Sequence, residues 1–480
     1  MSKSENSRQA NMTDQLLSLI REGQQLTFIQ QLKLTAYLSM PAIIAQLSSI
    51  AMQYVDASMV GRLGANAAAA IGLVSTTTWL FWGICSAAAT GFSVQVAHCI
   101  GSKDFHRARS ILKQSIIATL TFSCLLAATG AMISPHLPYW LGGDEAICHD
   151  SYVYFLIFAL FLPFLQINFL AGSMLRCSGN MRIPSTLNVL MCVLDVIFNF
   201  FLIFPSRNVG IFSLSLHIPG AGLGVTGAAL GTALAELVTG SLMLWYLCRY
   251  SPILNLRKEK SSFRPQKTTL HNAARIALPM GFEHVAICGA QIMTTVIVAP
   301  LGIIAIAANS FAIIAESLCY MPGYGIAEAA TTLVGQSLGA GRMRLMHRFA
   351  QICVWSGMLV MGIMGVILYV FAPQIFSLMT PVSEIRTLGV EILRIEAFAE
   401  PMFAASIVSY GVFVGAGSTL IPSLMNFGSI WCVRLTLAAL LAPTMGLKGV
   451  WLAMCIELCF RGSIFLFRLW CGKWIKNYNK

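Results

Sequence analysis

Twelve long apolar stretches dominate this chain, and each is long enough to cross a lipid bilayer as a helix. A membrane-spanning helix needs about 20 mainly apolar residues, because no water is present in the hydrocarbon core to satisfy unpaired backbone groups. Charged residues make up only 10% of the 480 residues, against about 25% in a soluble protein. The sequence therefore predicts an all-α polytopic membrane protein. The expected transmembrane helices are 34–60, 68–98, 113–134, 151–173, 184–204, 221–247, 275–299, 303–336, 351–372, 388–413, 419–442 and 446–469.

An internal repeat with an offset of 238 residues is the second constraint. Pro41 matches Pro279, Gly101 matches Gly339, and the first copy carries an extra loop at 206–219. Further matches are Gly64 with Gly302, Pro163 with Pro401, Gly179 with Gly417, Pro184 with Pro422 and Asn188 with Asn426. Each copy holds six spans, an even number, so both copies face the same way, as in parallel-repeat transporters. The predicted segments are 1–33, a six-helix bundle at 34–250, a linker at 251–274, a second bundle at 275–470, and a tail at 471–480.

Basic residues set the expected orientation, because Lys and Arg accumulate on the cytoplasmic side of a membrane. With the N-terminus inside, most Lys and Arg residues fall in cytoplasmic segments. The external loops hold only Arg62, Arg207, Arg386 and Lys448. We therefore expect a multi-pass protein of the plasma membrane, a bacterial inner membrane, with both termini in the cytoplasm. The net charge of +12 follows from this topology and indicates no nucleic-acid partner. The leucines and isoleucine of residues 16–20 predict a short helix in the membrane interface.

Acidic residues inside the spans are the first candidates for function, because a carboxylate at a helix centre costs about 2.5–3.5 kcal/mol on insertion scales. Asp56 lies in the first span, and the second copy has Thr294 in its place. Glu283 lies in the seventh span, where the first copy has Ala45. The scaffold is repeated but these acids are not, which favours a specific role. For Asp56 the alternative is a capping role at the external link that follows it.

A second acid of the first bundle can join Asp56. Asp195 lies in the fifth span, with Asn188 two turns before it and Asn199 one turn after it. Because helices 1 and 5 belong to one bundle, the two carboxylates can meet, and Thr232 of helix 6 can add a hydroxyl group. Such a pair, removed from water, can take up and release a proton or hold a sodium ion. The alternative for Asp195 is a hydrogen-bonded structural role.

Other polar residues of the spans have several interpretations. Tyr54, Glu316 and Gln336 are candidates for the wall of a substrate cavity, with packing or gating as the alternative. We expect Arg394 to pair with the acids of its own span, which are Glu391, Glu396 and Glu400. Glu457 and Arg461 are four residues apart and should form a salt bridge. Arg434 has no local partner and is expected to face Glu400 or a cavity.

No motif points to an enzyme. Walker A, HExxH and paired CxxC patterns are absent, and the fourteen Cys residues are scattered singly. The stretch GLGVTG at 222–227 matches G-x-G-x-x-G, but it opens a membrane helix without a βαβ unit, so close helix packing explains it better. We therefore expect neither catalytic activity, nor a cofactor, nor a structural metal, and only a coupling ion, H⁺ or Na⁺.

Several stretches resemble the multidrug and toxic compound extrusion (MATE) family over residues 34–470. They are YVDASMVGRLG at 54–64, MLRCSGNMRIPSTLN at 174–188, VGAGSTLIPSLMN at 414–426 and MPGYGIAEAATTLVGQSLGAG at 321–341. The last stretch most resembles the bacterial DinF-like branch. The resemblance implies two six-helix bundles around a V-shaped central cavity. It also implies efflux of amphipathic, often cationic compounds, driven by inward movement of protons or sodium ions.

The resemblance also implies roles for single residues. Asp56 and Asp195 match the acids of the family's N-terminal cation site, Thr232 matches a threonine that belongs to it, and Glu283 matches a helix-7 glutamate of some members. The chain departs from the family at two positions. Met191 replaces an asparagine four residues before the helix-5 acid, and Phe403 lies near the place of the helix-10 aspartate of the sodium-coupled branch. Sodium prefers several hard oxygen ligands, so both departures favour protons.

Two rival functions remain at this level. A flippase for lipid-linked oligosaccharides on the same scaffold would need a cationic cavity, whereas intramembrane arginine is limited to Arg394, Arg434 and Arg461. A membrane scaffold or receptor without transport would show no cation-coupled flux and no need for Asp56. The preferred partners are amphipathic small molecules and the lipid bilayer, and the protein is expected to be a monomer.

Overall fold

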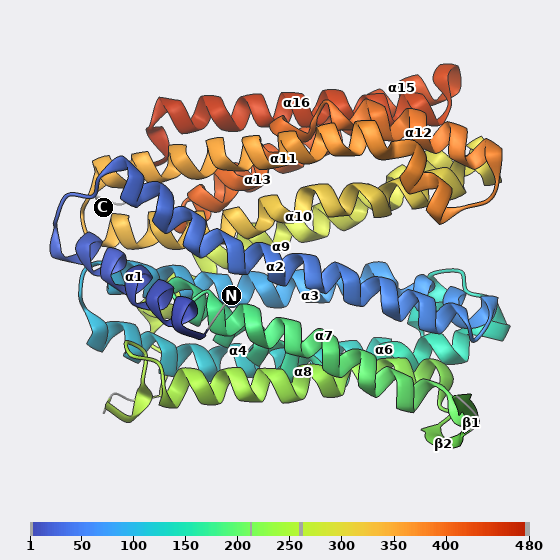
Figure 1. Cartoon of the computed structure of the whole chain (residues 1–480), viewed down its shortest axis with the longest axis horizontal. Helices are drawn as coiled ribbons and strands as arrows, with labels where there is room; N and C mark the ends of the chain where they lie inside the picture. Colours follow the sequence, from blue (N-terminus) through green and yellow to red (C-terminus); the bar gives the residue numbers. More distant parts are fainter. Residues whose placement is uncertain (1–2, 212–213, 259–262, 476–480) are drawn as a thin grey trace.

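Two bundles of helices run roughly along one axis of the molecule (Figure 1). The structure is a computed structural model and describes residues 3–211, 214–258 and 263–475. Within these residues, eleven helices are long and apolar enough to cross a membrane, and one bent pair of helices supplies a twelfth span. The prediction of an all-α protein with twelve transmembrane helices is therefore confirmed.

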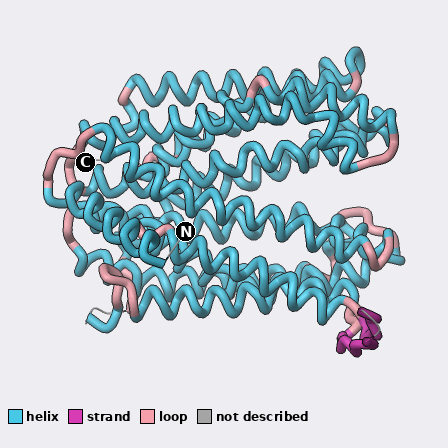
Figure 2. The backbone as a smooth tube through the Cα atoms, viewed as in Figure 1, coloured by secondary structure: helices cyan, strands magenta, loops and turns pink. Residues whose placement is uncertain are grey.

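The first half contains six spans around α6, which packs on α3, α4 and α8, while α7 packs on α2 and α8. Its helices are α1 (Lys3–Glu22), α2 (Phe28–Gly61), α3 (Ala65–Gly101), α4 (Phe105–Ile133), α5 (Leu137–Trp140), α6 (Glu145–Cys177), α7 (Arg182–Ile203) and α8 (Gly224–Arg249). The extra loop of this copy contains an antiparallel hairpin of β1 (Pro205–Ile211) and β2 (Leu214–Ala221), shown in magenta in Figure 2. We call this end of the molecule the hairpin end. The opposite end, with the connection between α8 and α9, is the linker end.

The second half repeats the six spans, but one span contains a π-helical turn and another is broken. Its helices are α9 (Lys267–Val298), α10 (Ile303–Gly339), α11 (Met343–Met379), α12 (Ser383–Ala397), α13 (Glu400–Gly415), α14 (Leu420–Gly428), α15 (Leu435–Met445) and α16 (Leu447–Cys471). Short turns η1 (Leu256–Lys258), η2 (Ala299–Leu301) and η4 (Lys473–Ile475) are 3₁₀, whereas η3 (Ser429–Arg434) is a π-helical turn between α14 and α15.

The tenth span, predicted as one helix over 388–413, is broken in the structure. α12 and α13 meet at an angle of 56° after Ala397. Pro401 is the second residue of α13, and it explains the break because it has no N–H for the carbonyl of Ala397 and its ring clashes there. The break places Glu396 and Glu400 on either side of the bend.

The two halves meet along α2, α3, α9 and α10. The tightest crossing lies near the linker end and joins the repeat-related glycines Gly101 and Gly339. A Cβ atom at Gly101 would lie 2.1 Å from the Gln336 carbonyl oxygen, and one at Gly339 would lie 2.1 Å from the His98 carbonyl oxygen. Only glycine fits at either position. From this crossing the ribbons of α2 and α10 diverge toward the hairpin end (Figure 1), which agrees with the expected V shape.

The N-terminal helix α1 is packed on protein, in contrast to the expectation of a helix in the membrane interface. Leu17 and Ile20 are fully buried in the same core cluster as Leu338 and Met346 of the second half. Leu17 also packs directly on Gly179, in the link between α6 and α7. Its apolar face is therefore not available to lipid, because that face joins the two halves at the linker end.

Candidate functional site

Two carboxylates of the first half meet at one asparagine. The Asn199 Nδ2 atom donates to Asp56 Oδ1 at 2.9 Å and to Asp195 Oδ2 at 3.1 Å. Asp195 and Asn199 lie four residues apart on α7, so both side chains point to the same face, toward Asp56 of α2. Asp195 and Asn199 are fully buried, whereas Asp56 is half-buried. The structure therefore brings together the two acids that the sequence placed in one bundle.

Helix α8 closes the site from a third side. Asp195 interacts with the side chains of Asp56 and Thr232, and the Thr232 hydroxyl also donates to the carbonyl oxygen of Ala228 at 3.3 Å. Glu236, one turn after Thr232, interacts electrostatically with Asp195. Sequence analysis missed Glu236, although an acid inside an apolar span, four residues from a candidate ligand, was a sufficient signal to include it.

Glycines of α8 explain how the helix comes so close to α7. A Cβ atom at Gly231 would lie 2.0 Å from Asn199 Oδ1, and one at Gly227 would lie 2.5 Å from the Leu202 carbonyl oxygen. The GLGVTG stretch ends at Gly227, which is one of the two glycines in this contact. The prediction of close helix packing is therefore confirmed for Gly227, whereas Gly222 and Gly224 adopt positive φ angles where the chain enters α8. Gly231 makes room for the asparagine that joins the two acids.

The acids of this site have no basic partner. Among the described residues, neither Asp56 nor Asp195 forms an ion pair, and the buried atoms Asp195 Oδ1 and Asn199 Oδ1 accept no hydrogen bond. A buried carboxylate without a counter-charge costs several kcal/mol. The arrangement therefore fits a bound proton or a small cation with oxygen ligands. A pocket of about 300 Å³ reaches α2 and α7 nearby, lined by Tyr54, Val55, Ser58, Met59, Arg62, Phe200 and Phe204.

A Gly231→Val substitution should damage this site through packing alone. The added side chain would displace Asn199, so we expect a loss of about 1–3 kcal/mol of stability, typical of overpacking, and a loss of any activity that depends on the acid pair. Thermal unfolding of the purified protein and vesicle transport measure the two effects. Gly72→Val is the matched control, because a Cβ atom there has nothing within 4 Å. Normal stability and transport in Gly231→Val would contradict this assignment.

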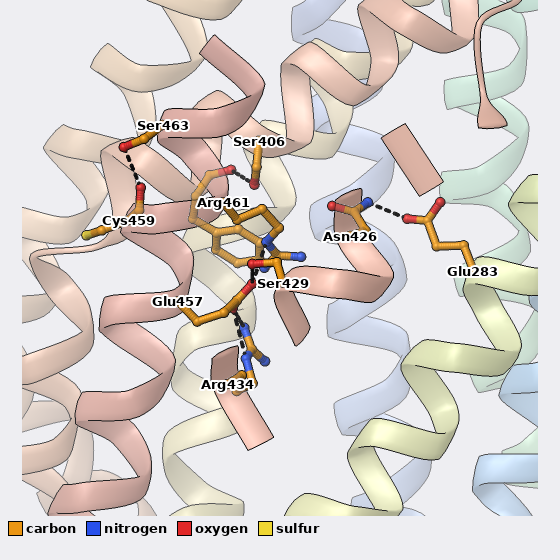
Figure 3. A network of polar contacts seen from close by, with 10 residues as sticks. Glu283, Ser406, Asn426, Ser429, Arg434, Glu457, Cys459, Arg461 and Ser463 are labelled. Atoms are coloured by element: carbon orange, nitrogen blue, oxygen red, sulfur yellow. Dashed lines mark hydrogen bonds and ion pairs between the residues drawn. The ribbon is translucent and has the colours of Figure 1, made fainter. Parts of the chain in front are cut away.

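Asn188 and Glu283 were grouped with the acid pair, and the structure places both elsewhere. Asn188 lies seven residues before Asp195, roughly 10 Å along the helix, and within the described residues its side chain forms no hydrogen bond to the pair. Glu283 is a buried residue of the second half. Its carboxylate accepts a hydrogen bond from Ser423 at 2.8 Å. It accepts another from Asn426 of α14 (Figure 3). Each half therefore has its own buried acid site.

The three candidates for a cavity wall occupy three different settings. The Tyr54 hydroxyl donates to the Ile314 carbonyl oxygen of α10 at 3.0 Å, so this residue links the halves beside the pocket. Gln336 is fully buried and donates to the Cys177 carbonyl oxygen at 2.8 Å. Glu316 is buried inside the second half. Gln336 and Glu316 are thus buried in protein contacts and do not line the pocket.

The charged residues of the second half pair differently from the sequence prediction. Glu457 forms the expected ion pair with Arg461 at 3.1 Å, and it also binds Arg434 at 2.7 Å (Figure 3). Arg394 instead donates to the Tyr369 carbonyl oxygen. Glu391, one turn before Arg394, pairs with Lys448 at 2.6 Å and is half-exposed. The predicted pairing of Arg394 with the acids of its own span is wrong, because Glu391 pairs with Lys448 and Arg394 binds a backbone carbonyl.

One family model matches both halves of the chain. The MatE model covers residues 41–201 and 279–440, together more than half of the length. The two matched segments begin at Pro41 and Pro279, which are the repeat-related prolines 238 residues apart.

Several curated proteins resemble the chain over nearly its full length. A probable multidrug resistance protein NorM of Thermotoga maritima is 26% identical, with 92% of each chain covered. A probable multidrug resistance protein YoeA of Bacillus subtilis is 22% identical, with 86% of this chain and 87% of that protein covered.

Solved structures share the fold. A crystal structure of MATE in complex with MaL6 superposes with a TM-score of 0.83 at 20% identity, covering 93% of this chain and 99% of that one. An outward-facing structure of a multidrug resistance MATE family transporter of the MOP superfamily gives 0.83 at 20% identity, covering 92% and 96%. A mutant of the Vibrio cholerae MATE transporter VcmN gives 0.81 at 18%, covering 96% and 98%. These superpositions show that the chain shares the fold of these structures.

Proposed function

The chain belongs to the MATE family, whose model matches both of its halves, and on this premise we propose that it is a secondary active efflux transporter. It would export amphipathic, often cationic compounds in exchange for protons. Relatives with the same length are described as multidrug resistance proteins, which supports this substrate class. We further propose a multi-pass protein of the plasma membrane with both termini in the cytoplasm, so that the hairpin end faces outward.

The contact of Asp56, Asn199 and Asp195 carries the proposal. Two carboxylates share one amide, and no ion pair neutralises them among the described residues, so a bound cation must balance the charge. Asp56 is half-buried and Asp195 fully buried, an order that suits uptake at Asp56 and storage further inside. This arrangement is what a carrier of a single coupling cation requires.

Protons are the preferred coupling ion for a structural reason. Met191 lies where the sodium-binding asparagine is expected, and its sulfur accepts from Asn168 at 3.6 Å, so this position adds no hard oxygen to the site. Phe403 contacts Tyr320 and the guanidinium of Arg461, so it fills the other expected position with an aromatic ring. Sodium is the second candidate, with Thr232 and Asn199 as its neutral oxygen ligands.

Transport would proceed by alternating access. A proton that arrives from the hairpin end neutralises Asp56 and weakens its attraction to the Asn199 amide, which frees α2 to move against α7. Helix α2 is continuous through Pro41. Because a proline inside a helix removes one backbone hydrogen bond, α2 can bend at this residue. The compound leaves on the hairpin side. Release of the proton on the linker side then restores the ionised pair.

The linker end would act as the opposite gate, because several hydrogen bonds and an ion pair cluster there. Gln336 donates to the Cys177 carbonyl oxygen, and the Thr332 hydroxyl donates to that of Arg176 at 3.1 Å. Arg176 also forms an ion pair with Glu328 at 3.6 Å. These bonds must break when the inward side opens. Their number on one short segment of α6 predicts that opening there is the slower half of the cycle.

A Gly339→Val substitution should open this gate. Its side chain has no room beside the His98 carbonyl oxygen, so the halves must separate at the linker end. We expect faster thiol labelling of Cys177, which is buried in the wild type, measured by mass spectrometry of the proteolytic peptide that contains it. Gly281→Val is the matched control, since a Cβ atom there meets nothing within 4 Å. Unchanged labelling in Gly339→Val would show that the crossing is not the gate.

Dye efflux in reconstituted vesicles tests the function itself. Wild-type protein should move a cationic dye under an imposed pH gradient in sodium-free buffer and lose this activity when the gradient is collapsed. Efflux that follows a sodium gradient without a pH gradient would assign sodium as the coupling ion. No cation-driven flux with a panel of cationic dyes would contradict the proposal. The flippase alternative is weakened because Arg434 and Arg461 bind Glu457 and Arg394 binds a backbone carbonyl.

A further inference from the structure

The second half contains a group of buried acids that the proposed transport site does not use. Glu396 and Glu400 lie on either side of the break between α12 and α13, and both are at most 1% exposed. All four of their carboxylate oxygens are buried without a hydrogen-bond partner. Gly365 of α11 packs on the side chain of Glu400, where a Cβ atom would lie 3.1 Å from that residue's Cβ. The packing thus holds an unpartnered acid inside the protein.

The charges around these acids do not balance. Glu396 interacts electrostatically with Glu316, Glu400 and Glu457, and with Arg434. The other ionisable groups that face the acids are Arg461 of α16, Cys319 and Tyr320 of α10, and Cys455 of α16. Four carboxylates therefore share two guanidinium groups, and Arg461 also interacts with Glu283 of α9. If all four acids were ionised, at least two negative charges would be uncompensated in a membrane interior, where unpaired charge is strongly unfavourable.

The two arginines are already committed to one acid. The Glu457 carboxylate forms ion pairs with Arg434 at 2.7 Å and with Arg461 at 3.1 Å (Figure 3). It also accepts a hydrogen bond from the Ser429 hydroxyl at 2.6 Å. The π-helical turn η3 explains this geometry, because its extra residue places Ser429 and Arg434 on the same carboxylate, and such turns are common at functional sites. Beyond Glu457, Glu316 is an acid that interacts electrostatically with both arginines.

A metal ion does not fit this cluster. Among the described residues, no three acidic, histidine or cysteine side chains lie close enough to hold a metal. The carboxylates do not surround a common point where a metal could bind. A single carboxylate can still bind a proton.

We propose that Glu396 and Glu400 form a second proton-binding site, in the second half, which holds two protons while Glu316 and Glu457 stay ionised opposite Arg434 and Arg461. This assignment balances the charges of these four acids and two arginines. The site is separate from the Asp56–Asp195 pair and does not depend on it. Loss of its protons would place two unpaired charges at the break of α12 and α13, so proton occupancy is linked to the bend of this span.

Infrared spectroscopy of the purified full-length protein tests the assignment, because a protonated carboxylic acid and a carboxylate absorb at different frequencies. Glu396→Gln and Glu400→Gln should each remove intensity from the carboxylic-acid band at neutral pH. Glu316→Gln should instead remove intensity from the carboxylate band, and so should the control Glu391→Gln, an exposed acid of the same helix paired with Lys448. An unchanged acid band in both Glu396→Gln and Glu400→Gln would overturn the proposal, as would its loss in Glu316→Gln.

A second measurement uses stability and requires no transport. If the folded chain holds two protons that the unfolded chain releases, the unfolding temperature must fall as pH rises. Glutamine resembles a protonated glutamate, so the double variant Glu396→Gln/Glu400→Gln should fold and should lose much of this pH dependence. An unchanged dependence in the double variant would contradict the site. Because transport is not measured, this result stands independently of the function proposed for the first half.

Discussion

An Asp56→Asn variant is expected to show pH-gradient-driven efflux no higher than that of protein-free vesicles. The asparagine oxygen can still accept from the Asn199 amide, which Asp56 does at 2.9 Å, so the fold and the contact between α2 and α7 should survive. An amide takes up no proton at physiological pH, so the step that releases α2 is lost. The measurement is the initial rate of dye efflux from reconstituted vesicles.

The control for Asp56→Asn is Asp150→Asn, which removes the same charge from an acid of α6 that forms no hydrogen bond to the pair. It should transport at the wild-type rate. An Asp195→Asn variant should resemble Asp56→Asn, because both acids share one amide. Wild-type efflux from Asp56→Asn would rule out the acid pair as the coupling site, even if other acids of the protein carried protons.

A Glu457→Gln variant should have the largest effect on stability. It leaves Arg434 and Arg461 without the carboxylate that binds them at 2.7 and 3.1 Å, and no other described acid lies within ion-pair distance of either. Removal of one partner from a buried ion pair costs about 3–5 kcal/mol, because a desolvated charge is left unpaired. Thermal unfolding in detergent should show a clearly lower midpoint at neutral pH.

Glu391→Gln provides the comparison, since its pair with Lys448 is short but half-exposed. Surface ion pairs contribute about 0–1 kcal/mol, so the midpoint should hardly move. Equal midpoints for Glu457→Gln and Glu391→Gln would mean that the buried network contributes little to the fold. In that case Arg434 and Arg461 would have to find other acids, and the charge balance described for Glu396 and Glu400 would be wrong.

Sequence patterns predicted the spans and the main acid pair for physical reasons that are local. Span length follows from bilayer thickness, and the meeting of Asp56 with Asp195 follows from two helices in one bundle. The spacing of Asp195 and Asn199, one helical turn, already placed both on one face. The structure adds the sharing of a single amide, and it adds Glu236, whose position depends on how closely α8 approaches α7.

The second half was harder to predict because its chemistry depends on tertiary breaks in the helices. Arg394 and Glu396 are two residues apart on α12, so the helix does not place them side by side, and Glu400 follows the break. The partners of Arg434 depend on a π-helical turn, and no residue pattern in 429–434 predicts such a turn. Local spacing therefore succeeded for Glu457 with Arg461 and failed wherever the helix was irregular.

The crossing of Gly101 with Gly339 has a consequence for the origin of the molecule. The two glycines are equivalent in the repeat, and a Cβ atom at either would lie 2.1 Å from a carbonyl oxygen of the opposing helix. Such reciprocal contacts are the signature of an isologous interface, in which a two-fold axis relates identical surfaces. A six-helix ancestor with this glycine could form the same crossing as a homodimer before gene duplication fused its subunits. Fusion then allowed the halves to diverge, and each could acquire its own acids.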